Sequence, residues 1–199
     1  ISLLLFFWMC TSCNAQTKNT STKLVGGGCE GCEAIFEYGN KKLAPTDTLP
    51  EYENNEPKLK ITGTVFKKDG KIPAENVIIY IYHTNRQGIY EIKDNEIGWA
   101  KRHGFIRGWV KTGKDGLYTF YTFRPVAYPN GIEPEHIHIT VKEPDKNEYY
   151  IDDYLFNDDP LLTQETRKER KNRGGSGIIK PKEKNGILLI ERNKNAWCR

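Results

Sequence analysis

The chain has 199 residues, of which 37% are hydrophobic and 28% are charged, and this composition suits one globular domain with a real core rather than two domains. Its net charge of +4 comes from 30 basic and 26 acidic residues that are mixed along the chain. The sequence has no concentrated basic stripe of the kind that binds a phosphate backbone, so nucleic acid is excluded as an expected partner.

The first residues of the chain differ from the rest in composition. Residues 1–9 (ISLLLFFWM) are a nearly unbroken apolar run, too short to span a bilayer and typical of a secretory signal. Cys13 resembles the acylated cysteine of a bacterial lipobox, with Cys10 as an alternative site and a plain signal peptide as the alternative to both. The polar tract 14–23 has the composition of a flexible tether. We therefore expect residues 1–13 to be a signal peptide of a bacterial cell-envelope lipoprotein, in the periplasm or at the outer membrane, with an N-terminal lipid as its only membrane attachment.

Three cysteines remain beyond the leader, namely Cys29, Cys32 and Cys198. A single C-x-x-C pair cannot make a four-ligand zinc site. Outside the cytoplasm a disulfide is the usual fate of such thiols, so we expect Cys29 to pair with Cys32, or either of them with Cys198. A redox-active pair is a weaker alternative, because no βαβ pattern surrounds the motif.

The body of the chain follows as short strands separated by turn residues. Residues 14–57 are predicted to be a tether and an irregular arm, since 42–57 contain three prolines and many acids and amides. From residue 58 onward, alternating or densely apolar segments predict strands at 59–66, 77–83, 107–110, 117–123, 136–141 and 187–190. Only 163–171 suggests a helical turn or two, and Asn185-Gly186 is a hairpin signal. We therefore predict that residues 58–199 form an all-β sandwich with long irregular loops and little helix.

Two histidines carry the first sign of chemistry. His136 and His138 are two residues apart on a predicted strand, so both imidazoles project from one face while Ile137 packs on the other. This spacing suits a metal ion, although such pairs also occur as ordinary surface or core histidines. A zinc site with three histidines would need another ligand, and neither His83 nor His103 lies in a matching strand.

Two tyrosines precede this pair of histidines in the sequence. Tyr128 lies in the turn 124–131 (RPVAYPNG), and Tyr90 ends the segment 85–90 (NRQGIY) that follows a buried strand. Tyrosines near strands are mostly packing residues with a polar tip, so neither tyrosine alone is strong evidence for a ligand.

The order of these motifs resembles a known family. The chain carries N-x-x-G-x-Y, R-G-x-x-x-T, D-G-x-Y-x-F-x-T, P-x-x-Y-P and P-x-H-I-H in this order between about residues 59 and 160, ending in LFNDDP at 155–160. This combination resembles the intradiol ring-cleavage dioxygenases, the family of protocatechuate 3,4-dioxygenase and catechol 1,2-dioxygenase. The likeness covers roughly half of the chain and is more specific than any one motif.

The resemblance implies that Tyr90, Tyr128, His136 and His138 ligate one non-haem Fe(3+) ion per chain. A ferric ion is a hard cation that suits phenolate oxygens, and a coordinated metal can drive off the phenol proton. The implied reaction uses O2 to cleave a catecholic ring between its two hydroxyl-bearing carbons. By the same resemblance the small aromatic diol displaces Tyr128, which takes up a proton and so acts as a catalytic residue. The sequence leaves the oligomeric state and the ring substituents open.

Two positions depart from the family pattern. Glu133 stands directly before the proline where the family has an arginine that stabilises developing charge, and Asp153 stands where the family has a glutamine. Arg107 is a candidate for supplying the missing positive charge. Because of these departures, an alternative is that the chain is a non-catalytic β-sandwich binding module of the cell envelope. A further alternative is that the fold uses another metal.

Overall fold

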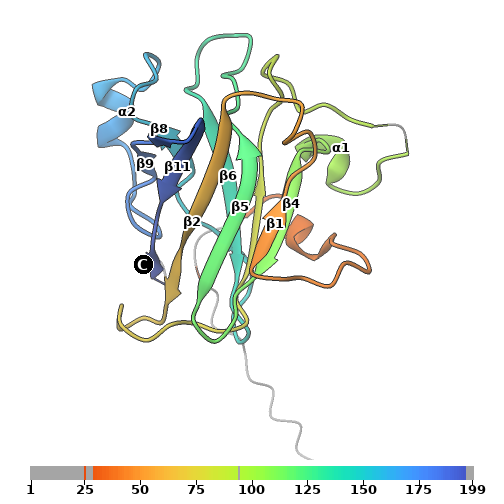
Figure 1. Ribbon diagram of the computed structural model, residues 1–199, viewed down its shortest axis with the longest axis vertical. Helices are drawn as coiled ribbons and strands as arrows, with labels where there is room; N and C mark the ends of the chain where they lie inside the picture. Colours follow the sequence, from red (N-terminus) through yellow and green to blue (C-terminus); the bar gives the residue numbers. More distant parts are fainter. Residues whose placement is uncertain (1–24, 26–28, 94, 196–199) are drawn as a thin grey trace, which may run out of the picture.

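The computed structural model of the chain describes residue 25, residues 29–93 and residues 95–195. Most secondary structure in these residues lies in two packed β-sheets (Figure 1). The helices that they contain are short, with bounds η1 Cys32–Phe36, α1 Ala100–His103 and α2 Gln164–Lys168. This arrangement confirms the predicted all-β sandwich with little helix. None of the helices in the described part of the chain is long and apolar enough to span a membrane.

The first sheet has the strand order β1-β5-β2-β11-β10. The short strand β12 pairs with the last residues of β2, past the part of β2 that pairs with β11. Its strands are β1 Thr46–Thr48, β2 Lys58–Phe66, β5 Leu117–Phe123, β10 Lys182–Lys184, β11 Ile187–Glu191 and β12 Lys194–Asn195. The long antiparallel pair of β2 and β5 forms the centre of this sheet, and β1 and β11 pair with them in parallel. The hairpin of β10 and β11 turns at Asn185 and Gly186, both with positive φ, as the sequence predicted.

The second sheet has the order β4-β3-β6-β8-β9, with β7 paired to β6. Its strands are β3 Ile78–Tyr82, β4 Arg107–Lys111, β6 His136–Lys142, β7 Tyr149–Tyr150, β8 Tyr154–Phe156 and β9 Ile178–Ile179. The central strand β3 is antiparallel to both β4 and β6. In this register Tyr82 lies directly opposite His138, which places the end of β3 beside the start of β6.

The core lies between the sheets and is built from alternate residues of each strand. Its central members are aliphatic and aromatic side chains that are almost fully buried, among them Leu59, Ile61, Ile79, Ile81, Phe120, Phe123, Ile137 and Ile139. Because successive side chains of a strand point to opposite faces, the residues between them point away from this core. On β3 and β6 those residues include Tyr80, Tyr82, His136 and His138.

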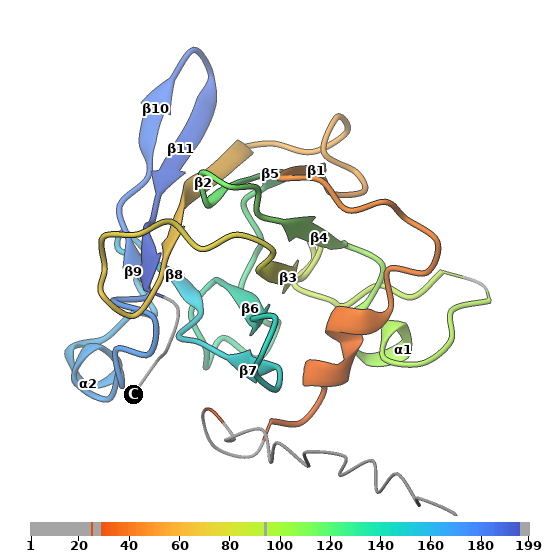
Figure 2. The same cartoon turned by 90° about the horizontal axis from the view of Figure 1, so that it is seen from below.

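The outer face of the second sheet is covered by the segment that the sequence predicted to be an irregular arm. Ala34 and Ile35 of η1 pack in a second buried cluster with Tyr80 and Trp109, and the Trp109 indole donates to the Ala34 carbonyl at 3.2 Å. Figure 2 shows η1 outside β3 and β4 and next to α1. Further along the arm, Asp47 of β1 accepts from the Trp109 backbone at 2.9 Å. Residues 29–57 therefore complete the fold rather than trail from it.

The structure joins Cys29 to Cys32 in a disulfide, one of the pairings that the sequence left open. The predicted signal peptide, its lipidation site Cys13, and Cys198 lie outside the described residues.

Candidate metal centre

The two histidines of the predicted site project from the start of β6. Ile137 and Ile139 bury their side chains in the core, and this alternation turns His136 and His138 to the opposite face. His136 is buried, whereas His138 is partly exposed. The strand thus fixes both imidazoles with the same alternation that builds the core.

The two tyrosines come from loops that pack directly on one another. Asn85 opens the first loop with a local turn, since its side-chain oxygen accepts from the backbone of Gln87 and Ile89 at 2.9 and 3.1 Å. Gly88 has φ +73°, and a Cβ placed there would lie 2.2 Å from the carbonyl oxygen of Ala127. Only glycine therefore lets the Tyr90 loop approach the Tyr128 loop this closely.

A hydrogen-bond acceptor at Nδ1 orients each imidazole. His136 Nδ1 lies 2.7 Å from the Pro134 carbonyl oxygen, and His138 Nδ1 lies 3.3 Å from Asp153 Oδ1. A carbonyl or a carboxylate oxygen can only accept, so each Nδ1 carries the proton and donates it. The Nε2 atom of each ring is then a lone-pair donor, ready to bind a metal ion. Tyr82 stacks on the His138 ring with 4.5 Å between ring centroids and holds its plane.

Four donor atoms meet in a closed ring. The Tyr90 oxygen lies 2.7 Å from the Tyr128 oxygen and 2.8 Å from His138 Nε2. His136 Nε2 lies 3.1 Å from the Tyr128 oxygen and 3.1 Å from His138 Nε2. Donors bound about 2.0–2.1 Å from one metal ion, at right angles to each other, lie roughly 2.9 Å apart. The spacing of the four atoms therefore fits a single small ion among them.

The count of protons supports the same conclusion. The ring has four short contacts, but only the phenols of Tyr90 and Tyr128 bring protons to it, because both Nε2 atoms are acceptors. If each phenol donates to an imidazole, no proton remains for the 2.7 Å contact between the phenol oxygens or the 3.1 Å contact between His136 and His138. Converging acceptors without protons repel each other, and a cation removes this repulsion.

Burial shapes the acid–base properties of the same groups. It raises the pKa of the Tyr90 phenol well above its ordinary value, helped by the hydrogen bond with Tyr128. Burial likewise raises the pKa of Tyr128, and the nearby carboxylates of Glu133 and Asp153 add to the rise. Burial lowers the pKa of His136. These shifts favour neutral side chains, so a bound cation is the means by which the phenols would ionise near neutral pH.

The remaining candidate residues fall in different places. Asp153 contacts His138, as described above, and Glu133 is exposed on the loop before β6. Arg107 is held away from this role by two carboxylates, with its guanidinium 2.7 Å from Glu37 and 3.7 Å from Glu96. The charged side chains that act on the tyrosines of the donor ring are thus carboxylates.

One participant was not predicted from the sequence. Tyr82 stacks on His138 and also lies parallel to His103, with 3.8 Å between those ring centroids. Tyr82 stood in an apolar strand segment as one aromatic residue among several, and only the pairing of β3 with β6 brings it against His138. No local feature of the sequence carries that signal.

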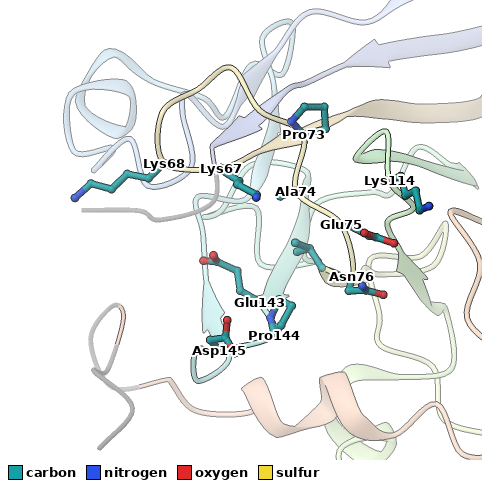
Figure 3. A pocket seen from close by; sticks show the side chains of 11 residues that line it. Lys67, Lys68, Pro73, Ala74, Glu75, Asn76, Lys114, Glu143, Pro144 and Asp145 are labelled. Atoms are coloured by element: carbon teal, nitrogen blue, oxygen red, sulfur yellow. The ribbon is translucent and has the colours of Figure 1, made fainter. Parts of the chain in front are cut away.

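Two cavities lie at opposite ends of the second sheet. One, of about 360 Å³, adjoins His138 at the donor end of β6. The other, of about 510 Å³, lies where β3 begins and β6 ends, and Figure 3 shows Lys67 and Glu143 extending into it while Lys68 points away. None of the donor residues lines the second cavity.

Among the residues that the structure describes, no three or more His, Cys, Asp or Glu side chains gather into a group that could hold a metal ion. The donor ring differs from such groups because half of its donors are phenols. The fold and the site together define a class of protein, a β-sandwich with a two-tyrosine, two-histidine donor set at the end of one sheet.

Comparison with known proteins identifies the family. A family model described as "Dioxygenase" matches residues 38–174. The chain is 30% identical over 137 residues to the protocatechuate 3,4-dioxygenase beta chain of Burkholderia cepacia, which covers 63% of this chain and 58% of that protein. It is also 30% identical over 145 residues to catechol 1,2-dioxygenase 1 of Acinetobacter lwoffii, which covers 60% of this chain and 45% of that protein. The chain belongs to the intradiol dioxygenase family, and it spans about half the length of these curated relatives.

Solved structures show the same fold at lower sequence identity. The dioxygenase domain of a dioxygenase carbohydrate-binding protein fusion from Streptomyces sp. SirexAA-E superimposes with a TM-score of 0.61 and 18% identity. The match covers 89% of this chain and all of that domain. At this identity the likeness establishes the shared β-sandwich.

Proposed function

We propose that this protein is a non-haem iron(III) dioxygenase that uses O2 to cleave a catecholic ring between its two hydroxyl-bearing carbons. The observation that carries the proposal is the ring of four donor atoms, with neighbouring atoms 2.7–3.1 Å apart and too few protons for its contacts. Membership of the intradiol dioxygenase family supports the reaction class. Tyr90, Tyr128, His136 and His138 are the residues that would hold one ferric ion per chain.

The donor set suits this ion chemically. Two phenolate oxygens match a hard, highly charged cation better than they match softer divalent metals. When bound, the ferric ion would supply the charge that ionises both phenols and that makes a chelated catecholate reactive toward O2.

The side chains of this chain have separate tasks in the proposed reaction. Tyr128 accepts a catechol proton at its phenolate oxygen, a role that its high pKa as a free phenol favours. Asp153 and the Pro134 carbonyl keep the Nδ1 protons of the two histidines, so that both Nε2 atoms stay available. Tyr82 stacks on His138 and so covers one face of its ring.

The experiment is the visible spectrum of the purified chain loaded with iron(III). Ferric phenolates absorb in the visible, so we expect a coloured protein whose absorption weakens in both Tyr90→Phe and Tyr128→Phe. Tyr121→Phe, on the first sheet, is the matched control and should leave the spectrum unchanged. Addition of catechol should shift the absorption, and oxygen uptake with formation of a muconate-type diacid should follow. A protein that takes up iron but stays colourless would refute the ligand assignment.

We also propose that the reaction takes place outside the cytoplasm, at the bacterial cell envelope. The Cys29–Cys32 disulfide supports this placement, since such bonds persist in oxidising compartments. In a bacterial host, fatty-acid labelling of the full chain should be lost in Cys13→Ala and kept in Cys10→Ala. Retention of the label in Cys13→Ala would assign the lipid to another residue, and absence of the label from the unchanged chain would exclude a lipid.

A further inference from the structure

The cavity beside His138 is lined by carboxylates and aromatic rings. Its volume is about 360 Å³, and its lining contains the carboxylates of Glu30 and Asp153 and the aromatic rings of Tyr82 and Tyr150. The other lining residues are Cys29, Gly31, His138, Ile139 and Thr140. None of the lining residues that the structure describes is a lysine or an arginine. Two carboxylates and two aromatic rings thus line one cavity that opens to solvent.

The cavity is linked to the donor ring through one imidazole. His138 directs Nε2 toward Tyr90 at 2.8 Å, and its Nδ1 donates to Asp153, which lines the cavity, at 3.3 Å. Tyr82 also belongs to both, because it stacks on His138 and contributes to the cavity wall. The His138 imidazole therefore stands between the donor ring, on its Nε2 side, and the cavity, on its Nδ1 side.

The lining has the chemistry that recognises an organic cation. Carboxylates accept charge-assisted hydrogen bonds from an ammonium group, and the face of a tyrosine ring attracts a cation. The guanidinium of Arg173 already lies over the Tyr150 ring, 3.9 Å from its centroid. The carboxylates are therefore the main groups that would attract a cationic ligand. Glu30 pairs with Arg102, but both side chains are largely exposed, so this ion pair is weak and can be exchanged.

We propose that this cavity is a subsite for an ammonium group, carried on a short aliphatic arm of a catechol whose hydroxyls occupy the donor ring. This inference rests on the proposed function and adds the substrate class, an amine-bearing catechol. A catechol with a carboxylate arm is disfavoured for the same reason, because Glu30 and Asp153 would repel it.

The test compares three catechols with arms of similar size and different charge. They are 3,4-dihydroxyphenethylamine, 4-ethylcatechol and 3,4-dihydroxyphenylacetate, titrated without oxygen into the full iron-loaded chain and followed by the shift in visible absorption. We expect the amine to bind roughly tenfold more tightly than the neutral compound, the range of a hydrogen bond to a charged group, and the acid to bind more weakly than both.

Variants at exposed positions separate the subsite from the donor ring. Glu30→Gln should weaken binding of the amine roughly threefold and leave 4-ethylcatechol unchanged. Arg102→Gln frees Glu30 and should tighten binding of the amine. Glu33→Gln removes the same charge from an exposed residue outside the cavity lining, and it should change nothing.

The outcomes distinguish the subsite from the reaction. If 4-ethylcatechol binds and is cleaved once oxygen is admitted, but the amine has no advantage in binding, the subsite is refuted and the proposed function stands. The same holds if Glu30→Gln and Glu33→Gln behave alike. If none of the three catechols perturbs the spectrum, the proposed function fails and the subsite fails with it.

Discussion

Gly88 offers a direct test of how the donor ring is assembled. It has φ +73°, and a Cβ there would lie 2.2 Å from the Ala127 carbonyl oxygen and 3.3 Å from Pro129. In Gly88→Ala the left-handed backbone costs about 1–2 kcal/mol, and relief of the clash adds about 1–3 kcal/mol. We expect the free energy of unfolding to fall by about 2–5 kcal/mol in total. Because the clash pushes the Tyr90 and Tyr128 loops apart, the ferric phenolate absorption should weaken as well.

Gly131 provides the matched control for this variant. It lies in the Tyr128 loop with φ +64°, but a Cβ there would meet nothing within 4 Å. Gly131→Ala therefore carries the same backbone cost, about 1–2 kcal/mol, without the clash. Urea unfolding of the iron-free proteins gives the stability difference, and the absorption per bound iron reports the donor ring. Equal losses of stability in the two variants, with equal spectra, would refute the reasoning that contact between the loops positions the tyrosines.

Three further predictions concern the surroundings of the site. Burial lowers the pKa of His83 from 6.5 to about 4, so the unfolded chain binds the proton first as the pH falls, and stability is lost between those pH values, by about 3 kcal/mol. In urea titrations His83→Gln should lack this part of the pH dependence, and identical slopes would exclude it. Asp153→Leu should lower the affinity for ferric ion roughly 10- to 100-fold, because His138 loses the acceptor of its Nδ1 proton. Competition with a chelator measures this loss, and an unchanged affinity would remove Asp153 from the site. Reduction of the Cys29–Cys32 disulfide should cost about 2 kcal/mol, the chain-entropy estimate for so short a loop. The urea midpoint with and without dithiothreitol measures this cost, and an unchanged midpoint would contradict it.

The strands were predictable wherever alternation was visible in the sequence. The segment 117–123 corresponds to β5, and the prediction for β2 and β6 differs from the structure by a single residue at one end. Each of these strands places apolar side chains on the core face and other side chains on the opposite face. The sequence therefore alternates with a period of two residues, which predicts a strand.

The arm was not predictable, because its structure depends on distant partners. Residues 29–57 show no strand or helix period, yet η1 is held by Trp109, and β1 pairs with β5 about seventy residues further along the chain. The grouping of Tyr90 and Tyr128 with the histidines was likewise inferred from the order of motifs and not from local pattern. Stacking of Tyr82 on His138 required the strand register, which the sequence does not state.

The structure also separates the two tyrosines by how firmly each is held. Gly104 packs so closely on the Tyr90 loop that a Cβ there would lie 3.0 Å from the Tyr90 carbonyl carbon, and Phe105 donates to the next residue, Glu91, at 2.9 Å. The turn after Tyr128 is closed by the Gly131 amide at 2.9 Å and then runs into the exposed Ile132. A donor that must accept a proton and give up its place to a substrate needs freedom to move, whereas a permanent ligand needs a rigid loop. This asymmetry of the backbone agrees with the proposed function, in which Tyr128 would take up the catechol proton and Tyr90 would stay a ligand.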